Sequence, residues 1–442
     1  MQKLPDLIEL VLRRLHDAGY EAYIVGGCVR DSLLGLVPQD YDVTTSALPE
    51  EVEAVFADYS VIETGLKHGT VTVLIDHIPV EITTFRTESV YSDHRHPDQV
   101  AFTRNLREDA ARRDFTMNAM AYCEETGLMD YFGGQEDLKA GVIRCVGVAE
   151  ERFREDALRI LRALRFSARF GFRIEEKTAK AAHDCRELLR FVSAERIASE
   201  LVKILCGKYA KQIILEFPDV LGVVIPELIP MVGYDQRNPH HCFDLLTHTA
   251  ITVAEVPPVP TLRLAALLHD IGKPACFFTD EKGIGHYYGH PEVSADLAEE
   301  ILRRLKLDNA TRKTVVQLVR HHDMVIVPSE KAVRRAIAKI TPELFWDLMT
   351  LKRADSIGTG RTDDVRMVRH SEVRSLAEEI FQKAHCFSLR DLAIGGRDLI
   401  ACGMKPGKEI GALLDDLFEA VLSGEVENKK DVLLKLAKEK LA

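Results

Sequence analysis

The stretch VGGCVRDSLLGLVPQDYDVTT, residues 25–45, places two chemical features on one strand–helix–strand unit. Gly26 and Gly27 precede a helical turn, and glycines at a helix N-terminus let backbone N–H groups approach a phosphate. Asp40 and Asp42 open an extended segment, in which positions i and i+2 point to the same face. Adjacent carboxylates repel each other unless a cation lies between them, and hard oxygen ligands suit Mg²⁺. Together these features favour phosphoryl or nucleotidyl transfer by a two-metal mechanism over a glycine turn beside a solvated acidic pair.

The composition bounds the classes of protein to consider. A chain of 442 residues is too long for one hydrophobic core and predicts roughly two to four domains. No apolar run approaches the roughly 20 residues that span a bilayer, so we expect no membrane partner. The nine cysteines include no Cys-x-x-Cys pair, which indicates reduced thiols and a cytoplasmic location. The net charge of −11 argues weakly against a nucleic-acid partner, although basic residues can cluster locally.

Two strands are expected at residues 69–75 and 78–85, downstream of the acidic pair. Glu81 falls on the second of these strands, and its ordinary interpretation is an exposed strand residue. Beside the acidic pair it is equally a candidate third carboxylate, able to ligand a metal or to activate a hydroxyl nucleophile.

Residues 86–111 lose all hydrophobic periodicity and predict a long loop that is functional or disordered. The loop ends at Arg113 and Asp114, which could hold a phosphate and a ribose hydroxyl. The apolar residues that follow predict a buried helix. An ordinary helix N-terminus with Asp114 near the N-cap is compatible with that function.

Four motifs then form a set: GGCVRDSLLG with DYDVTT, VEITTFR, RRDFTMNAM and EDALRILRALRF. Their kind and order resemble the class II tRNA nucleotidyltransferases, which comprise the bacterial CCA-adding enzymes and poly(A) polymerases, over roughly the first half of the chain. The resemblance implies a nucleotidyltransferase head in which Asp40 and Asp42 bind Mg²⁺. It also implies that Gly27 and Arg30 contact the incoming nucleotide, with Arg113 near its sugar and phosphates.

The last motif lies in residues 148–170, which show a strong helical pattern. Asp156 and Arg159 are three residues apart and would be neighbours on one helix face. A carboxylate that accepts from an exocyclic amino group, beside a guanidinium that donates to the adjacent ring nitrogen, would accept cytosine and adenine and reject guanine and uracil. By resemblance the two residues form the amino-acid template for the base. Salt bridges on a solvated face are the commoner explanation of such spacing, and the upstream motifs disfavour it here.

Two further arginines continue this helix at steps of three. We expect Arg162 to reach the triphosphate. At about 100° per residue, Arg165 faces nearly away from Asp156, so it either lies at the edge of the site or is structural.

A second constellation of polar residues begins after residue 231. His248 lies in one apolar helical pattern, His269 and Asp270 end another, and Asp355 follows downstream. Imidazole and carboxylate groups that converge from several helices are typical of a metal site. The adjacent His-Asp pair resembles the HD-domain metal-dependent phosphohydrolases, and these four residues match the core ligand set of that family.

Additional histidines resemble the extra ligands of dinuclear HD proteins. His290 matches one of them, and either His321 or His322 matches the other, of which we favour His322. Lys273 follows the His-Asp pair and could bind a phosphate. We expect a divalent transition metal or Mg²⁺ here, and an active or metal-binding domain rather than a decayed scaffold.

The predicted fold class is α+β, with a mixed β-sheet in a nucleotidyltransferase head followed by all-helical domains that include an HD module. The expected domains are the head at 1–143, a helical neck for nucleotide recognition and RNA binding at 144–230, the HD module at 231–357, and a helical tail for tRNA contact at 358–442.

The predicted function is template-independent addition of C, C and A to the tRNA 3′ end from CTP and ATP, with HD phosphohydrolase activity in addition. Poly(A) polymerase or A-adding activity remains an alternative, because the base-recognition argument admits adenine in every case. An HD phosphohydrolase whose head only binds nucleotide is an alternative of another class. The intact carboxylates and His-Asp set argue against a non-catalytic RNA-binding regulator. The oligomeric state and the way in which addition terminates stay open.

Overall fold

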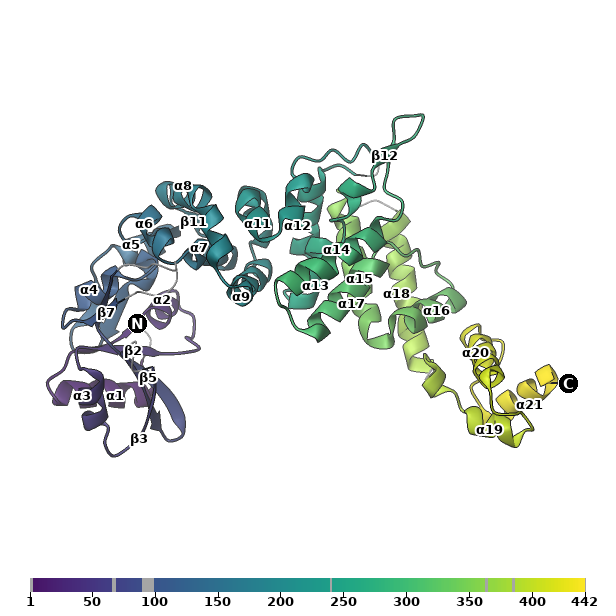
Figure 1. Cartoon of the computed structure of the whole chain (residues 1–442), viewed down its shortest axis with the longest axis horizontal. Helices are drawn as coiled ribbons and strands as arrows, with labels where there is room; N and C mark the ends of the chain where they lie inside the picture. The colour runs from purple at the N-terminus through teal and green to yellow at the C-terminus, as the bar shows by residue number, and fades with distance from the viewer. Residues whose placement is uncertain are drawn as a thin grey trace. The chain divides into compact units, whose positions relative to one another are not determined.

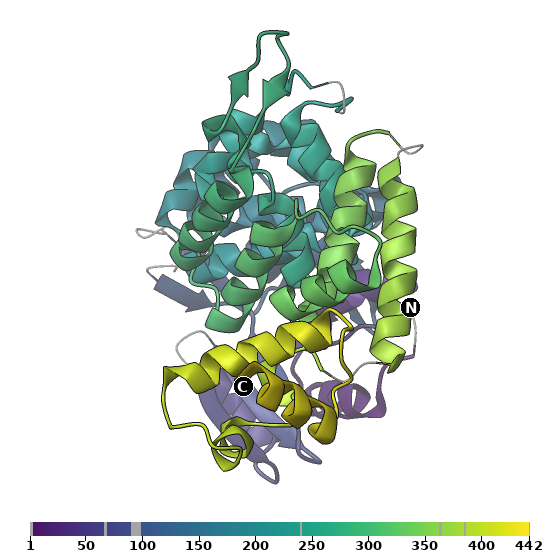
Figure 2. The ribbon, with the colours of Figure 1, turned by 90° about the vertical axis from the view of Figure 1, so that its right-hand side faces the viewer.

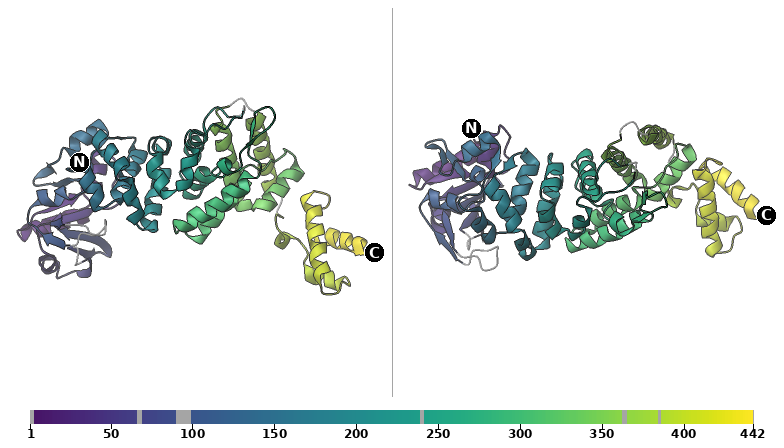
Figure 3. Two further views of the ribbon diagram at one scale, coloured as in Figure 1. Left: turned by 45° about the horizontal axis from the view of Figure 1, so that its top comes forward. Right: turned by 90° about the horizontal axis from the view of Figure 1, so that it is seen from above.

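The computed structural model describes residues 3–65, 69–89, 99–238, 241–361, 365–383 and 386–441. The chain divides into two compact units, Met1–Pro226 and Glu227–Ala442, close to the expected boundary at 230/231. Figure 1 labels the elements, and Figures 2 and 3 show the same ribbon from other directions. The finer domain boundaries stay predictions.

A mixed β-sheet organises the first unit, as the sequence predicts. Among the described residues, seven strands form this sheet in the order β3-β4-β5-β2-β1-β8-β9. Only the β2–β5 pair is parallel among these neighbours. The strands are β1 (Ala22–Val25), β2 (Asp42–Thr45), β3 (Ser60–Gly65), β4 (Thr70–Ile75), β5 (Ile78–Thr84), β8 (Met120–Cys123) and β9 (Gly127–Asp130).

The β4–β5 hairpin confirms the two strands expected downstream of the acidic pair. Its two turn residues, Asp76 and His77, have φ values of 49° and 65°. Positive φ at both central positions matches the right-handed twist of the flanking strands. The hairpin thereby fixes the register in which Val80 and Ile82 point into the core.

Helices surround this sheet and continue the chain beyond it (Figure 1). They are α1 (Asp6–Asp17), α2 (Gly27–Leu33), α3 (Pro49–Val55), α4 (Leu106–Ala111), α5 (Gly134–Ala140), α6 (Ala149–Glu155), α7 (Leu158–Phe170), α8 (Glu176–Asp184), α9 (Ala194–Leu205), α10 (Ala210–Glu216) and α11 (Pro218–Val224). Short strand pairs accompany them: β6 (Arg86–Ser89) with β7 (Gln99–Phe102), and β10 (Val142–Ile143) with β11 (Arg173–Ile174).

The prediction of a long loop at 86–111 is wrong for its described residues. Strands β6 and β7 pair antiparallel, and helix α4 follows them. Asn105 caps that helix, because its side chain accepts a hydrogen bond from the backbone N–H of Arg107 at 3.0 Å. Short elements of this kind carry too few residues for a periodic signal. Residues 90–98 of the expected loop lie outside the described residues.

The helix expected after Arg113 is also absent from this described segment. Only a 3₁₀ turn forms, Thr116–Asn118, before the chain enters β8. The carboxylate of Asp114 accepts the backbone N–H of Phe115 at 2.8 Å, and Phe115 pairs with Cys145 in an isolated bridge. These contacts hold the backbone extended, although the apolar residues favour a helix.

The single helix expected at 148–170 is broken into α6 and α7. Asp156 has extended backbone angles, φ −136° and ψ 103°, between the two helices. Its carboxylate accepts the backbone N–H of Leu158 at 3.1 Å, which satisfies a free donor at the start of α7. Asp156 therefore does not lie inside one continuous helix with Arg159, although the backbone N–H of Arg159 still donates to the carbonyl of Asp156 at 3.0 Å.

The second unit is helical apart from a small hairpin of β12 (Phe278–Thr279) and β13 (Gly285–His286), which the prediction of all-helical domains missed. Its helices are α12 (Leu245–Glu255), α13 (Pro260–Leu268), α14 (His290–Arg304), α15 (Asn309–His321), α16 (Glu330–Ile340), α17 (Pro342–Gly358), α18 (Val365–Lys383), α19 (Gly396–Ala401), α20 (Lys408–Leu422) and α21 (Lys430–Leu441). No helix in the described ranges is long and apolar enough to cross a bilayer.

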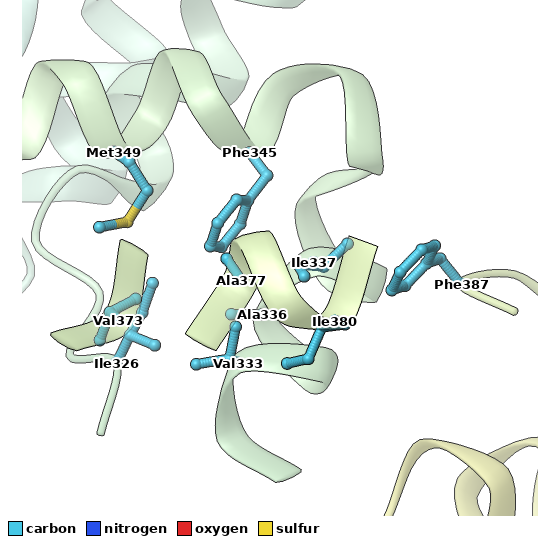
Figure 4. Close-up of a cluster of buried hydrophobic side chains, with 10 residues drawn as sticks. All are labelled: Ile326, Val333, Ala336, Ile337, Phe345, Met349, Val373, Ala377, Ile380 and Phe387. Carbon is cyan, nitrogen blue, oxygen red and sulfur yellow. The ribbon is translucent and has the colours of Figure 1, made fainter. Parts of the chain in front are cut away.

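One apolar cluster joins α16, α17 and α18 (Figure 4). Phe345 of α17 is fully buried, Ile337 approaches from α16, and Ala377 and Ile380 approach from α18. The expected boundary at 357/358 therefore falls between two helices that share a core. A separate cluster holds together α19, α20 and α21.

Replacing Phe345 with alanine should lower the free energy of unfolding of the second unit by about 3–5 kcal/mol, because the cavity left among rigid helices refills poorly. Trp346 is the single tryptophan and packs on Phe345 with ring centroids 5.6 Å apart, so its fluorescence in urea reports this unit. Phe345→Leu, which keeps most of the volume, should lose clearly less. Coincident unfolding curves for Phe345→Ala and the unmodified protein would contradict this account of the core.

Candidate active site and candidate metal centre

The glycine turn of the first unit, at Gly26 and Gly27, allows another group to come close to the backbone. Gly26 has φ 77°, a conformation that side chains disfavour, and a Cβ added there would lie 3.0 Å from Nη1 of Arg113. The backbone N–H of Gly26 donates to the carbonyl of Met120 at 3.3 Å, which ties the turn to the sheet. Gly27 then begins α2, so the pair lies beside a guanidinium with no side chain between them.

The two aspartates line the same cavity as the glycines. Asp42 begins β2, whereas Asp40 precedes the strand, so the expectation that both lie on one strand is wrong for Asp40. They nevertheless interact: burial raises the pKa of Asp42, Arg113 opposes that rise, and the charge of Asp40 adds to it. Two carboxylates that repel each other on one cavity wall suit a divalent cation.

Glu81 lies one strand away from Asp42. The parallel register pairs Val43 with Ile82, and the preceding residues of the two strands are Asp42 and Glu81. Paired residues of neighbouring strands share a face of the sheet, so Glu81 is on the same face as Asp42. Its side chain is exposed and is not part of the cavity wall.

Arg30 is held rigidly against the cavity. It is only 4% exposed, and its guanidinium donates to Asn118 at 2.7 Å and to Asp31 at 2.8 Å. The same group stacks over the ring of Phe166 at 4.9 Å. Burial lowers its pKa, and the Asp31 carboxylate partly offsets that effect. The guanidinium is therefore a fixed positive charge at the cavity wall.

Arg162 and Asp114 form an ion pair at the cavity wall, in which the carboxylate is buried and the Arg162 side chain is one-third exposed. The guanidinium donates twice to Oδ2 of Asp114, at 2.8 and 2.5 Å. Burial alone would raise the pKa of Asp114, but Arg162, helped by Asn118, lowers it to about 2. Asp114 thus anchors Arg162, and its contact with a ribose hydroxyl stays a prediction.

The cavity measures about 690 Å³ and is strongly cationic. Arg165 belongs to its wall and also pairs with Glu200 of α9 at 3.0 Å, so the choice between a role in the site and a structural role stays a prediction. Asn118, which lies in the motif RRDFTMNAM but received no predicted role, and Lys203, which lies in none of the four motifs, also line the cavity. The cations of the wall are Arg30, Arg113, Arg162, Arg165, Arg169 and Lys203, and its carboxylates are those of Asp40, Asp42 and Asp114.

The predicted base-recognition pair lies outside this wall. Asp156 accepts from Arg196 of α9 at 2.9 Å. Arg159 is 9% exposed and donates to Glu155 at 2.6 Å and to the carbonyl of Arg112 at 3.1 Å. Each member of the pair therefore has other partners in this conformation.

The second unit brings together the first four predicted metal ligands. His248, His269, Asp270 and Asp355 offer atoms that all lie within 4.8 Å of one another. Nε2 of His248 is 3.2 Å from both Asp270 and Asp355, and 3.1 Å from Nε2 of His269. They come from α12, from the end of α13 and from α17, so only the packing of three helices assembles them.

A second group shares Asp270 with the first. Nε2 of His290 lies 3.3 Å from Oδ1 of Asp270, and Nε2 of His322 lies 3.5 Å from it. His321 belongs to neither group. The two oxygens of Asp270 thus face different pairs of histidines. This is the arrangement expected for two neighbouring cations that share one carboxylate.

The imidazoles are oriented by the backbone. In three of them the Nδ1–H group donates to the backbone carbonyl of the residue three positions earlier. His269 donates to Ala266 at 2.8 Å, His290 to Tyr287 at 2.8 Å, and His322 to Val319 at 2.6 Å. Each bond directs Nε2 inward as the free ligand atom, which is the usual support of a metal-bound histidine. The facing Nε2 atoms of His290 and His322 are 3.2 Å apart, a contact that a cation or a proton must satisfy.

Charge coupling in this centre is strong. Burial opposes ionisation of Asp270, but His269 and Lys273 hold its pKa well below the usual range. Burial would lower the pKa of His269, yet Asp270 and Asp355 raise it to about 10. Lys273 lies 2.6 Å from Asp270 and is 6% exposed, so it is a buried partner of the carboxylate.

Comparison with known families defines the class of protein. The family model described as "Poly A polymerase head domain" matches residues 22–144. The model "Probable RNA and SrmB- binding site of polymerase A" matches residues 171–228, and "tRNA nucleotidyltransferase domain 2" matches residues 290–437. The mixed sheet, the glycine turn and the acidic pair thus form a nucleotidyltransferase head.

Relatives match over nearly the whole chain. The CCA-adding enzyme of Lactobacillus delbrueckii subsp. bulgaricus is 38% identical over 420 residues, which cover 95% of this chain and 94% of the relative. That of Lactobacillus helveticus is 37% identical, with 98% of each chain covered. The solved structure of the Bacillus stearothermophilus CCA-adding enzyme in complex with CTP is 30% identical with a TM-score of 0.74, and the match covers 100% of this chain and 98% of that one. The chain belongs to the family of CCA-adding enzymes.

The Asp114–Arg162 pair predicts a pH dependence of stability. The folded pKa of Asp114, about 2, lies below its ordinary value of 3.8. The ion pair therefore contributes about 2 kcal/mol to the free energy of unfolding above pH 4. This contribution is lost as the pH falls through 2. Asp114→Asn should lose at least that amount at pH 7 and should be less sensitive to acid in urea unfolding at pH 7, 4 and 2.5. Glu187→Gln, a change in an exposed side chain, serves as the control, and equal acid sensitivity of Asp114→Asn and the unmodified protein would count against the pair.

Proposed function

We propose that the protein adds C, C and A to the 3′ end of tRNA, using CTP and ATP and releasing pyrophosphate. The cationic cavity that unites the glycine turn with Asp40 and Asp42 carries this proposal. The near-complete match to relatives that are CCA-adding enzymes supports it over poly(A) or A-only addition. A cytoplasmic location fits a tRNA substrate and nine free cysteines.

The reaction follows from the residues of the cavity. The RNA 3′-hydroxyl attacks the α-phosphorus, a new P–O bond forms, and the bond to the β-phosphate oxygen breaks as pyrophosphate leaves. Mg²⁺ held by Asp40 and Asp42 supplies a Lewis acid for the charge that develops. Arg30 and Arg113 hold the triphosphate beside the glycine turn. Glu81 is the proposed third carboxylate, on the same face of the sheet as Asp42.

Recognition of the base requires a change of partners. Asp156 would exchange Arg196 for the exocyclic amino group of C or A, and Arg159 would exchange Glu155 for the ring nitrogen. Arg162 and Arg165 already line the cavity and would contact the nucleotide from the same helix. We assign the helices of 144–230 and the tail of 358–442 to contact with the RNA.

Asp156→Ala should reduce the preference for CTP and ATP over UTP and GTP by about 10-fold or more, since a hydrogen-bonding site rejects the wrong base by leaving polar groups unpaired. Single-nucleotide incorporation kinetics on a tRNA transcript ending in CC measure this ratio. Asp184→Ala, on the exposed side of α8, should leave it unchanged. Unaltered discrimination in Asp156→Ala would remove the residue from base recognition.

The cluster of histidines and aspartates in the second unit supports the proposal of a second activity. Two ligand groups that meet at Asp270 fit a pair of divalent transition-metal or Mg²⁺ ions, as in HD phosphohydrolases. Such metals lower the pKa of bound water and polarise a phosphoryl oxygen. The reaction would be hydrolysis of a phosphate ester: water oxygen bonds to phosphorus, and the ester oxygen leaves with a proton. An HD phosphohydrolase whose head only binds nucleotide remains the alternative to an active head.

One experiment with Asp42→Ala and His269→Ala separates the two centres. Transcripts ending before CCA and after CC are incubated with Mg²⁺ and CTP, ATP or both, and hydrolysis of p-nitrophenyl phosphate is measured with Mn²⁺. We expect addition to stop after CCA in the unmodified protein, to fall at least about 1000-fold in Asp42→Ala, and to persist in His269→Ala. Hydrolysis should show the opposite pattern.

Each departure from this pattern has a distinct meaning. One A on the CC transcript without C on the shorter one indicates an A-adding enzyme, and a long A ladder indicates a poly(A) polymerase. Hydrolysis without any extension would overturn the transferase proposal and leave the alternative of a nucleotide-binding head.

A further inference from the structure

Two cations of the cavity in the first unit have no role in the reaction described above. Arg169 and Lys203 line its wall, whereas the triphosphate and the base are assigned to other residues. Their side chains are 50% and 53% exposed. Those of Arg30 and Arg165 are only 5% and 16% exposed. The cavity therefore has a deep part with buried guanidinium groups and a mouth with two accessible cations.

Arg169 shares a carboxylate with a deep arginine. Asp31 is buried, and its Oδ1 lies 2.7 Å from Arg30 whereas its Oδ2 lies 3.3 Å from Arg169. Arg30 is held in addition by Asn118 at 2.7 Å. One negative charge thus faces two positive charges, and the closer contact belongs to the buried guanidinium. Arg169 therefore keeps positive charge that an added anion can neutralise.

Lys203 is arranged in the same way around Glu200, a buried residue of α9. Oε1 of Glu200 lies 3.0 Å from Arg165 and 3.6 Å from Lys203. The deep arginine again has the closer contact, and the exposed cation has the longer one. An anion that enters the mouth can therefore bind the ammonium group of Lys203 while Arg165 stays paired.

The two mouth cations come from adjoining helix ends. Arg169 lies in the last turn of α7 and Lys203 in the last turn of α9, and these helices pack against each other (Figure 1). A Cβ added to Gly207 would lie 2.6 Å from the carbonyl oxygen of Ala168, so glycine is needed where the two ends meet. The backbone N–H of Tyr209 donates to the same carbonyl at 2.8 Å. This packing fixes the helix ends that carry the two cations.

The reaction brings a second polyanion next to the nucleoside triphosphate. The attacking 3′-hydroxyl belongs to the last nucleotide of the RNA, and a phosphodiester joins that nucleotide to the rest of the strand. When the hydroxyl lies against the α-phosphorus, this phosphodiester is one nucleotide away from the bond that forms. The triphosphate is assigned to cations of the deep part, so the accessible cations of the mouth are complementary to the phosphodiester.

We infer that Arg169 and Lys203 bind the last phosphodiester of the RNA and thereby place its 3′-hydroxyl. The inference rests on the nucleotidyl transfer proposed above and adds a phosphate site for the acceptor strand. A contact between a cation and a phosphate carries no information about the base. Such a site therefore suits an acceptor whose terminal base changes from one addition to the next.

The first test separates the two substrates of the transfer. Arg169→Ala and Lys203→Ala should each raise the KM for a tRNA transcript ending in CC about 10-fold, because one charged hydrogen bond is lost. The KM for ATP should stay within about twofold, because the triphosphate keeps its own contacts. Arg169→Lys and Lys203→Arg keep the charge and should retain most of the affinity for RNA. Arg13→Ala, a change in an exposed side chain of α1, controls for the loss of a positive charge.

The salt dependence of RNA binding tests the ionic character of the contact. The Kd is measured by fluorescence anisotropy of a labelled transcript at several KCl concentrations. Each alanine variant should reduce the slope of log Kd against log[KCl] by about 0.7, the value for one phosphate contact with a single strand. Arg13→Ala should leave the slope unchanged.

A neutral linkage in the RNA identifies which phosphate is bound. The last phosphodiester of the transcript is replaced by an uncharged methylphosphonate, and both RNAs carry a 2′-O-methyl group beside that linkage. The replacement should raise the Kd of the unmodified protein about 10-fold. It should have little further effect on the double variant of Arg169→Ala and Lys203→Ala, because losses that remove the same contact are not additive. A methylphosphonate further upstream in the acceptor stem should change the Kd of both proteins equally.

These outcomes keep the phosphate site separate from the proposed function. The Kd values do not require catalysis, so the absence of addition by the unmodified protein would overturn the transferase proposal alone. Equal Kd values for RNA in the double variant and the unmodified protein would overturn the phosphate site. A rise of the KM for ATP, with or without a rise for RNA, would assign the two cations to the triphosphate or to the packing of the cavity. Equal losses from the terminal methylphosphonate in both proteins would show that this phosphate is not their ligand.

Discussion

The ion pair of Asp114 and Arg162 joins the sheet of the first unit to α7. A carboxylate can be buried only when its charge is fully satisfied, and Asp114 also accepts from Asn118 at 3.0 Å. The extended segment before β8 and the start of α7 are therefore fixed against each other. The next turn of the helix carries Phe166, over which Arg30 stacks, so α2 and the glycine turn are positioned by the same link. This ion pair therefore helps to fix the wall of the cavity that the glycine turn and α7 share.

The second unit applies the same constraint to metal ligands. Asp270 is 1% exposed, and the surrounding imidazoles and Lys273 satisfy its charge. The histidines are directed inward by bonds from Nδ1 to backbone carbonyls, so the centre is preorganised before a cation arrives.

The two residues proposed for base recognition differ from these two rigid centres. Asp156 and Arg159 both lie near the α6–α7 break, and each is engaged by a neighbour, Arg196 or Glu155. If these side chains exchange partners when a nucleotide binds, their polar groups are hydrogen-bonded both before and after binding. The free-energy cost of breaking the first set of hydrogen bonds is then small. In the proposed function, a site that accepts C twice and then A would benefit from side chains that have two sets of partners.

The sequence by itself determined the features that depend on local patterns. The strands of the β4–β5 hairpin, the glycine turn and the acidic pair follow from spacing and residue type, because period and turn chemistry act over a few residues. The candidate metal ligands followed from the resemblance of the His-Asp pair to HD proteins. Tertiary structure decided which partners each side chain takes. It broke the helix at Asp156, whose two carboxylate oxygens accept from Arg196 and from the backbone N–H of Leu158, and it placed Arg165 at the cavity wall. It also chose His322 over His321, because Val319 at the end of α15 accepts its Nδ1–H and turns Nε2 toward Asp270. Such choices depend on elements far apart in the chain, and no local pattern encodes which of them will meet.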